Sequence, residues 1–141
     1  MRSAHYHDRL EAKVPAVLAG LLGVDVGDVE VRTDDESGAD MVITAGPTFV
    51  VEVKGSTSAG VVAAAVKQVQ EYAARIRRRT VPVVAVPFMG PVGRKICEEA
   101  GVGWIDFSGN AHVVAPGLRV IVEGKPNQFK AVGRPRDLFA P

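Results

Sequence analysis

The sequence contains a single cysteine, Cys97, and no long apolar run among its 141 residues. One cysteine excludes an intrachain disulfide and a zinc cluster held by thiolates. No stretch approaches the ~18 apolar residues of a membrane-spanning helix, and the first residues lack the apolar segment of a secretory signal. No glycine-rich loop has the spacing of a nucleotide-binding motif. These absences predict a cytoplasmic protein without a membrane segment or a disulfide framework.

The residues that are present are typical of one globular domain, since 47% are hydrophobic and 23% are charged. A disordered chain would hold far fewer aliphatic side chains, so disorder is excluded except at the ends. Residues 1–66 carry five basic and ten acidic side chains, whereas residues 67–141 carry twelve basic and six acidic ones. This asymmetry indicates either a surface for an anionic partner such as nucleic acid, or two solvated faces of opposite sign.

Apolar side chains recur with the periods of helices and strands along most of the chain. Helical spacing covers residues 8–22, 62–76 and 92–100. Strand-like segments cover residues 29–33, 40–44, 48–54, 81–87, 102–107, 112–115 and 119–123. This order predicts an α/β domain with a mixed sheet flanked by helices over residues 1–123. Residues 124–141 hold three prolines and four basic residues without periodicity, which predicts an extended basic arm or linker.

Local signals predict where the helices begin and end. Asp8 is the expected N-cap of the first helix, and Pro15 predicts either a kink or a later start. Gly23 is expected to end that helix, and the serines and threonine of residues 56–58 are expected to cap the next one.

The chemically distinctive residues are Asp40, Glu52 and Lys54, which lie on an expected antiparallel hairpin around Gly46 and Pro47. Side chains alternate along a strand, so Glu52 and Lys54 project from one face and their apolar neighbours from the other. A hairpin bent near its end would bring Asp40 beside Glu52. Two carboxylates and a backbone carbonyl form an oxygen site for Mg²⁺, and a nearby lysine can hold a water for attack on a phosphodiester.

The pattern Asp40-x11-Glu52-x-Lys54, with a helix before it and a helix and a strand after it, resembles the PD-(D/E)XK nuclease superfamily. The resemblance covers roughly residues 8–87. It implies a restriction-endonuclease-like mixed sheet flanked by helices, with an αβββαβ core that is followed here by a C-terminal β-hairpin. Ala39 stands where the motif of the family has proline.

The resemblance also assigns roles to individual residues. Asp40 and Glu52 would be the metal-binding acids, the carbonyl of Val53 a further ligand, and Lys54 the catalytic lysine. The implied metal is Mg²⁺, for which Mn²⁺ can substitute.

Two further positions match branches of the same superfamily. Gln68 and Tyr72 form the Gln-x3-Tyr pattern of the RecB-like branch, in which the glutamine helps to position the substrate or groups of the active site. An ordinary helix surface is the alternative for this pair. Glu11 resembles the additional acidic metal ligand of resolvase-like members.

The expected activity is therefore metal-dependent DNA endonuclease cleavage, by a homodimer or as part of a larger assembly. Basic residues would contact phosphates without reading sequence, so DNA binding is expected to weaken steeply with salt. These residues are Arg75, Arg77, Arg78, Arg79, Lys125, Lys130, Arg134 and Arg136.

Two other interpretations remain open. The chain can be a non-catalytic nucleic-acid-binding or regulatory module on the same fold. It can also be an unrelated α/β domain in which Glu52 and Lys54 form a structural ion pair.

Two other groups of polar residues are less informative. Residues 104–112 predict either a hairpin that faces a substrate or partner, or a turn in which Asp106 and His112 are solvated, and turn chemistry favours the second. His5 and His7 are interpreted as incidental, because two histidines without a third fixed ligand seldom form a metal site.

Overall fold

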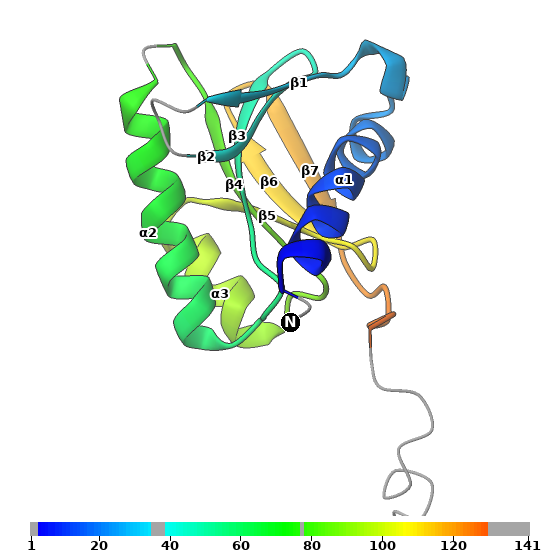
Figure 1. Ribbon diagram of the computed structural model, residues 1–141. Coiled ribbons are helices and arrows are strands. Elements are labelled where there is room, and N and C mark those ends of the chain that lie inside the picture. Colours follow the sequence, from blue (N-terminus) through cyan, green and yellow to red (C-terminus); the bar gives the residue numbers. More distant parts are fainter. Residues whose placement is uncertain (1–2, 35–38, 77, 130–141) are drawn as a thin grey trace, which may run out of the picture.

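The computed structural model describes residues 3–34, 39–76 and 78–129, in which helices flank a seven-stranded mixed sheet (Figure 1). The helices are α1 (Ser3–Leu22), α2 (Ala59–Arg75) and α3 (Pro91–Glu99), with a short 3₁₀ helix η1 (Val26–Asp28). The strands are β1 (Glu30–Asp34), β2 (Ala39–Thr44), β3 (Thr48–Val53), β4 (Val81–Val86), β5 (Gly103–Asp106), β6 (Ala111–Ala115) and β7 (Leu118–Val122). The prediction of an α/β domain with a mixed sheet and flanking helices is confirmed.

The strands follow one another across the sheet in chain order, from β1 to β7. The first three are antiparallel neighbours, β3 to β5 run parallel, and β5 to β7 are antiparallel again. Parallel neighbours require crossover connections, and α2 and α3 supply them. The predicted β2–β3 hairpin is confirmed, with Met41 opposite Val51 and with Gly46 at a φ of +82° in its turn.

Each face of the sheet is covered by its own apolar layer, because side chains alternate along the strands. α1 packs on one face through Leu10, Val14 and Leu18, which are at most 2% exposed. α2 and α3 pack on the other face, and Figure 1 shows them on the opposite side of the sheet from α1. Trp104, which is 1% exposed, is buried in this second layer.

The first helix begins earlier than the sequence pattern predicts. α1 starts at Ser3, so Asp8 lies inside the helix, and the predicted N-cap at Asp8 is wrong. The helix also continues through Pro15, which rules out a start near that residue. Burial explains both differences, because Tyr6 and Leu10 in the early turns pack on the apolar layer under α1. Tertiary packing thus outweighs the backbone amide that proline lacks.

The other predicted helix ends agree with the structure. α1 ends at Leu22, and the following Gly23 has a φ of +70°. Ser58 caps α2, since its side chain accepts a hydrogen bond from the Val61 amide at 3.4 Å. In the described ranges, none of the helices combines the length and apolarity needed to cross a membrane.

Candidate functional site

The end of the β2–β3 hairpin brings Asp40 to the last residues of β3. Because Met41 lies opposite Val51, the register continues with Asp40 opposite Glu52. The Val53 amide donates a hydrogen bond of 2.9 Å to Asp40 Oδ2. The bonded amide fixes the Asp40 carboxyl group beside the carboxyl end of β3, which is the position that the sequence pattern predicts.

Glu52 and Lys54 lie on the face of the sheet that α2 covers. Glu52 pairs with Val84 of β4, and both Val84 and Val50 belong to the apolar layer under α2. Lys54 Nζ lies 3.0 Å from Glu52 Oε2, so the two side chains share this face as predicted. Glu52 itself is 4% exposed. The pair therefore lies near the end of β3, where Glu52 is almost fully buried and Lys54 remains partly exposed.

One oxygen of this buried glutamate has no protein partner. Glu52 Oε1 makes no hydrogen bond with any of the described residues, while Oε2 binds Lys54. A buried oxygen left without a donor costs free energy, because it has lost its hydration. Glu52 therefore has one oxygen bound to an ammonium group and one oxygen available for a ligand.

Burial and neighbouring charge make Glu52 harder to ionise. Burial raises the pKa of Glu52, and the negative charge of Asp40 raises it further, while Lys54 and His7 act in the opposite direction. The pKa of Glu11 on α1 is also raised, mainly by burial, and Asp40 contributes to that increase. The three carboxyl groups thus interact electrostatically, which is typical of sites that concentrate negative charge for a cation.

We expect the Glu52→Gln substitution to stabilise the protein at neutral pH, by on the order of 1 kcal/mol or about 3–5 °C in Tm. The raised pKa of Glu52 means that its contribution to stability is full below about pH 4.5 and is lost as the pH rises through its folded-state pKa. The Tm difference between variant and wild type should therefore be near zero at the acid end and grow toward pH 7. Thermal unfolding between pH 4.5 and 8 measures it. A variant less stable than wild type at pH 7 would instead support a structural ion pair.

His7 is the residue of this site that the sequence analysis missed. Its Nε2 lies 3.0 Å from the Val53 carbonyl oxygen and 3.4 Å from Asp40 Oδ2. Its Nδ1 lies 3.4 Å from Glu11 Oε2, one helical turn further along α1. His7 therefore contacts three of the predicted site residues, which the sequence analysis did not expect. The spacing of four residues between His7 and Glu11 was the available signal, because such residues share a helix face.

The donor set fits a divalent cation. Ligand atoms of His7, Asp8 and Glu11 lie within 4.8 Å of one another, and Asp40 adjoins them through His7. Carboxylate and carbonyl oxygens suit Mg²⁺, whereas an added imidazole suits Mn²⁺ and later transition metals. His7 already contacts Asp40 Oδ2 and the Val53 carbonyl, so a cation on those oxygens would share or replace its contacts.

Gly55 sets how closely α1 approaches this site. A Cβ atom at Gly55 would lie 2.6 Å from Cε2 of Tyr6 and 3.8 Å from Cδ1 of Leu10. Any larger residue there must displace the Tyr6 ring, and with it the packing of the start of α1 against the end of β3. Close packing therefore favours glycine directly after Lys54.

We expect Gly55→Ala to destabilise the protein by about 1–3 kcal/mol, which is typical of overpacking. Gly60→Ala is the matched control, because nothing lies within 4 Å of its added Cβ and residue 60 is in the first turn of α2. The control should gain up to about 1 kcal/mol from the higher helix propensity of alanine. Thermal or urea unfolding of both variants measures this. Equal stability of the two variants would contradict the close approach of Tyr6.

Gln68 is a half-buried residue of α2, the helix that covers the face of the sheet on which Glu52 lies. Its Oε1 is buried and, like Glu52 Oε1, has no hydrogen-bond partner in the described part of the chain. Tyr72, one turn further on, packs against the apolar layer under α2, and the Arg75 guanidinium lies 5.8 Å from its ring centroid. The structure thus gives Gln68 an available oxygen but gives Tyr72 a packing role.

The arginines after α2 lie at the other end of the sheet from this site. Val81 of β4 is opposite Phe49 near the start of β3, whereas the site is at the end of β3. α2 has 17 residues and so separates its two ends by about 25 Å. Arg75, Arg78 and Arg79 are exposed at the far end, and Arg77 lies outside the described residues. The structure does not bring this group to the carboxylates.

The beginning of the predicted basic arm is bound to the domain. Asn110 Oδ1 accepts a hydrogen bond from the Lys125 amide at 2.9 Å, and Asn110 Nδ2 donates to the Lys125 carbonyl at 3.0 Å. The Gln128 amide donates to Ser108 Oγ at 3.1 Å, and Lys13 Nζ of α1 lies 5.6 Å from the Phe129 ring centroid. The described part of the arm, which ends at Phe129, therefore lies beside α1. Its remaining basic residues, Lys130, Arg134 and Arg136, lie outside the described range.

The polar segment of residues 104–112 has a structural role. Asp106 is fully buried and accepts hydrogen bonds from the amides of Met89, Ser108 and Asn110 and from Asn110 Nδ2, at 2.8–3.1 Å. The expected turn is present, with Gly109 at a φ of +106°. The expectation of a solvated Asp106 is wrong, because its carboxyl group closes the β5–β6 turn from the inside.

Comparison with known proteins gave no match, whether with family models, with curated protein sequences or with solved structures.

Proposed function

We propose that the protein is a Mg²⁺-dependent endonuclease that hydrolyses phosphodiester bonds in DNA, on a restriction-endonuclease-like fold of the PD-(D/E)XK type. The observation that carries this proposal is the convergence of Asp40, Glu52 and Lys54 at the end of the β2–β3 hairpin. The order of α1, β1 to β3, α2 and β4 supports it, because it matches the αβββαβ core that the resemblance implies.

Asp40, Glu52 and the Val53 carbonyl would hold the metal, and Glu11 would add a further carboxylate. Support comes from the unpartnered Oε1 of Glu52 and from the raised pKa values of Glu52 and Glu11, since a bound cation would relieve both costs. When bound, Mg²⁺ supplies positive charge against the phosphate and orients it for in-line attack.

Lys54 would orient the attacking water. Its ammonium group is held 3.0 Å from Glu52 Oε2, and that contact fixes its position while leaving it two further N–H donors. A water that accepts one of them is held at the edge of the site with a lone pair free for phosphorus. Gln68, with its unpartnered Oε1, would position the water or the substrate from the α2 side.

Binding of DNA would depend on contacts to phosphates. The described part of the arm passes beside α1, the helix that carries Glu11. Lys125, Lys130, Arg134 and Arg136 of this arm would contact phosphates. Arg75, Arg78 and Arg79 would meet only a longer substrate, since α2, which is about 25 Å long, separates them from the end of the sheet that holds the site. Arg77, the fourth of these predicted phosphate contacts, lies outside the described residues. A homodimer or a larger assembly would be needed to cut both strands in one binding event.

The direct test is cleavage of supercoiled, linear, single-stranded and branched DNA with Mg²⁺, Mn²⁺ or EDTA. We expect metal-dependent nicking by the wild type that is lost in the Glu52→Gln variant. Glu71→Gln is the matched control, because it makes the same chemical change at an exposed position of α2. Gel electrophoresis of time courses gives the rates and the preferred DNA shape.

Cleavage that persists in EDTA, or that Glu52→Gln leaves unchanged, would contradict the proposal. Cleavage lost equally in both glutamine variants would point to a general loss of fold, which the Tm measurements on the same samples detect.

A second candidate function is a non-catalytic nucleic-acid-binding or regulatory module on this fold. His7 favours it, because its imidazole already contacts Asp40 Oδ2 and the Val53 carbonyl, two of the proposed metal ligands. Salt-dependent DNA binding without cleavage, under every metal condition, is the result expected for this alternative.

A further inference from the structure

The last strand of the sheet, β7, has a free edge. Within the described residues its only neighbour is β6, with which it pairs from Ala115–Leu118 to Ala111–Val122. The turn between β6 and β7 has two residues, so Ala115 and Leu118 form the hydrogen-bonded pair next to it. Hydrogen-bonded and non-hydrogen-bonded pairs alternate along an antiparallel ladder, so the backbone N–H and C=O groups of Arg119 and Ile121 point away from β6. An edge of this kind is a template for another strand.

The side chains along this edge alternate in a pattern that can pair with itself. Arg119 and Ile121 of β7 and Glu123, which directly follows the last residue of this strand, are two residues apart, are all exposed, and lie on the side of the sheet that carries α3. Ile121 is 38% exposed, and Val114, opposite Arg119 on β6, is 49% exposed. Neither belongs to the apolar layer under α2 and α3, so this corner of the sheet is uncovered within the described structure.

We infer that β7 pairs antiparallel with β7 of a second copy of the chain, about a two-fold axis at Ile121. In that register Ile121 faces its own copy, and Arg119 lies opposite the partner's Glu123 on the same face. Each dimer then contains two such opposite-charge pairs around one apolar contact. The inference rests on the edge alone and does not depend on the proposed nuclease activity.

Charge distinguishes this register from its neighbours. An axis at any residue of the strand keeps the outward-facing residues opposite one another, and the nearest alternatives are axes at Val120 and Val122. An axis at Val120 sets Arg119 opposite the partner's Ile121 and leaves Glu123 unpaired. An axis at Val122 sets Ile121 opposite the partner's Glu123 and leaves Arg119 without an acidic partner, because the chain turns at Gly124, whose φ is +86°, and Lys125 is bonded to Asn110. The Ile121 axis alone pairs every charge.

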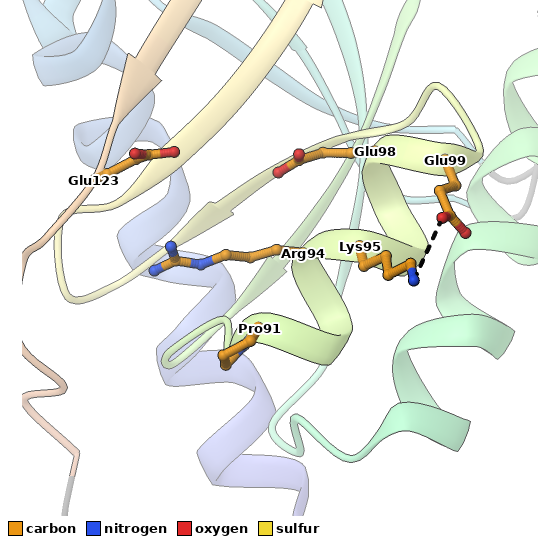
Figure 2. A pocket seen from close by; sticks show the side chains of 6 residues that line it. All are labelled: Pro91, Arg94, Lys95, Glu98, Glu99 and Glu123. Atoms are coloured by element: carbon orange, nitrogen blue, oxygen red, sulfur yellow. Dashed lines mark ion pairs between the residues drawn. The ribbon is translucent and has the colours of Figure 1, made fainter.

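The surroundings of Glu123 also favour a basic partner. Glu123 borders an open hollow of about 480 Å³ between α3 and the end of β7, lined by Pro91, Arg94, Lys95, Glu98, Glu99 and Glu123 (Figure 2). Lys95 is already engaged with Glu99 at 3.9 Å, and Glu98 accepts a hydrogen bond from Trp104 Nε1. The Arg94 guanidinium lies 5.2 Å from the Trp104 ring centroid. The partner's Arg119 would approach from the side that Glu123 occupies.

Disulfide trapping tests the register. The native Cys97 is buried and its pKa is raised to about 12, so an introduced cysteine would be the reactive one. Facing residues of antiparallel strands have Cα atoms about 5.5 Å apart, within the range that a disulfide spans. Ile121→Cys should therefore give a disulfide-linked dimer under mild oxidation. Arg119→Cys alone should not, because its copies would lie about 13 Å apart.

A mixture of Arg119→Cys and Glu123→Cys chains should also form a linked dimer, whereas neither chain does so alone. In sedimentation velocity, the wild type should show a reversible dimer that Arg119→Glu weakens at least about tenfold and that Arg119→Glu with Glu123→Arg restores. A monomeric Ile121→Cys protein after oxidation, or equal cross-linking of Arg119→Cys, would overturn the inference. These readouts need no DNA, so their failure is distinct from failure of the cleavage test.

Discussion

Replacing Lys54 with alanine is expected to lower metal-dependent DNA cleavage by at least about 10²-fold, which is typical of removing a group that positions a proton-transferring water. Lys54 is the only basic residue within ion-pair distance of Glu52 in the described structure, and its Nζ lies 3.0 Å from Glu52 Oε2. Its loss removes the donor that would hold the water and leaves the carboxylate uncompensated. Lys67→Ala, at an exposed position on α2, is the matched control and should cleave like the wild type.

The same variant separates a catalytic role from a structural one. Lys54 lowers the pKa of Glu52, so its removal should raise that pKa further and make the buried carboxylate costlier at pH 7. We expect Lys54→Ala to lose about 1–3 kcal/mol and Lys54→Ala with Glu52→Gln to recover most of it. The double variant reports on stability alone, because Glu52→Gln by itself is expected to abolish cleavage. Cleavage lost in Lys54→Ala at a temperature where that variant is still folded supports a catalytic role of Lys54. Cleavage by Lys54→Ala at the wild-type rate would assign the pair to structure alone.

Replacing Asp106 with alanine is expected to cost about 3–5 kcal/mol and to lower Tm by about 10–20 °C. Asp106 is 0% exposed and accepts four hydrogen bonds, which come from Met89 and from the Ser108–Asn110 turn. Without the carboxyl group, three buried amides lose their acceptor, and the turn that holds Lys125 and Gln128 loses its support.

Asp28→Ala is the control for this effect, because Asp28 is exposed on η1 and should shift Tm by less than about 2 °C. Urea unfolding of both variants gives the free energies. A Tm loss of only a few degrees for Asp106→Ala would mean that the turn keeps its shape without the carboxyl group.

The part of the site that could be predicted from the sequence is the part that depends on local rules. The hairpin, the shared face of Glu52 and Lys54, and the position of Asp40 follow from strand alternation and a Gly-Pro turn. His7 could not be placed in this way, because its contact with Val53 joins residues 46 positions apart. Only the docking of α1 brings that histidine to the end of β3.

The burial of individual side chains also could not be predicted from the sequence patterns. The sequence predicts that Asp106 is a solvated turn residue, but its side chain is fully buried, and the Met89 amide in the β4–α3 connection donates a hydrogen bond to it. The start of α1 differs from the prediction for the same reason, because Tyr6 and Leu10 in the early turns pack on the apolar layer under the helix. Strand positions were predicted well because β-branched runs mark them directly.

The strand order of the sheet has a consequence for how the chain folds. Each strand pairs with the strand that precedes it in the sequence, so the sheet can grow by adding one strand at a time as the chain leaves the ribosome. The antiparallel neighbours are joined by short loops and the parallel ones by α2 and α3, so each pairing is between segments close in the sequence, which favours fast folding. α1 precedes the sheet in the sequence, but its apolar face meets Val113 and Val120 of β6 and β7, so its layer is completed only when these two strands have joined the sheet. Until then the growing edge of the sheet is unpaired, and β7 is the strand on which that growth stops.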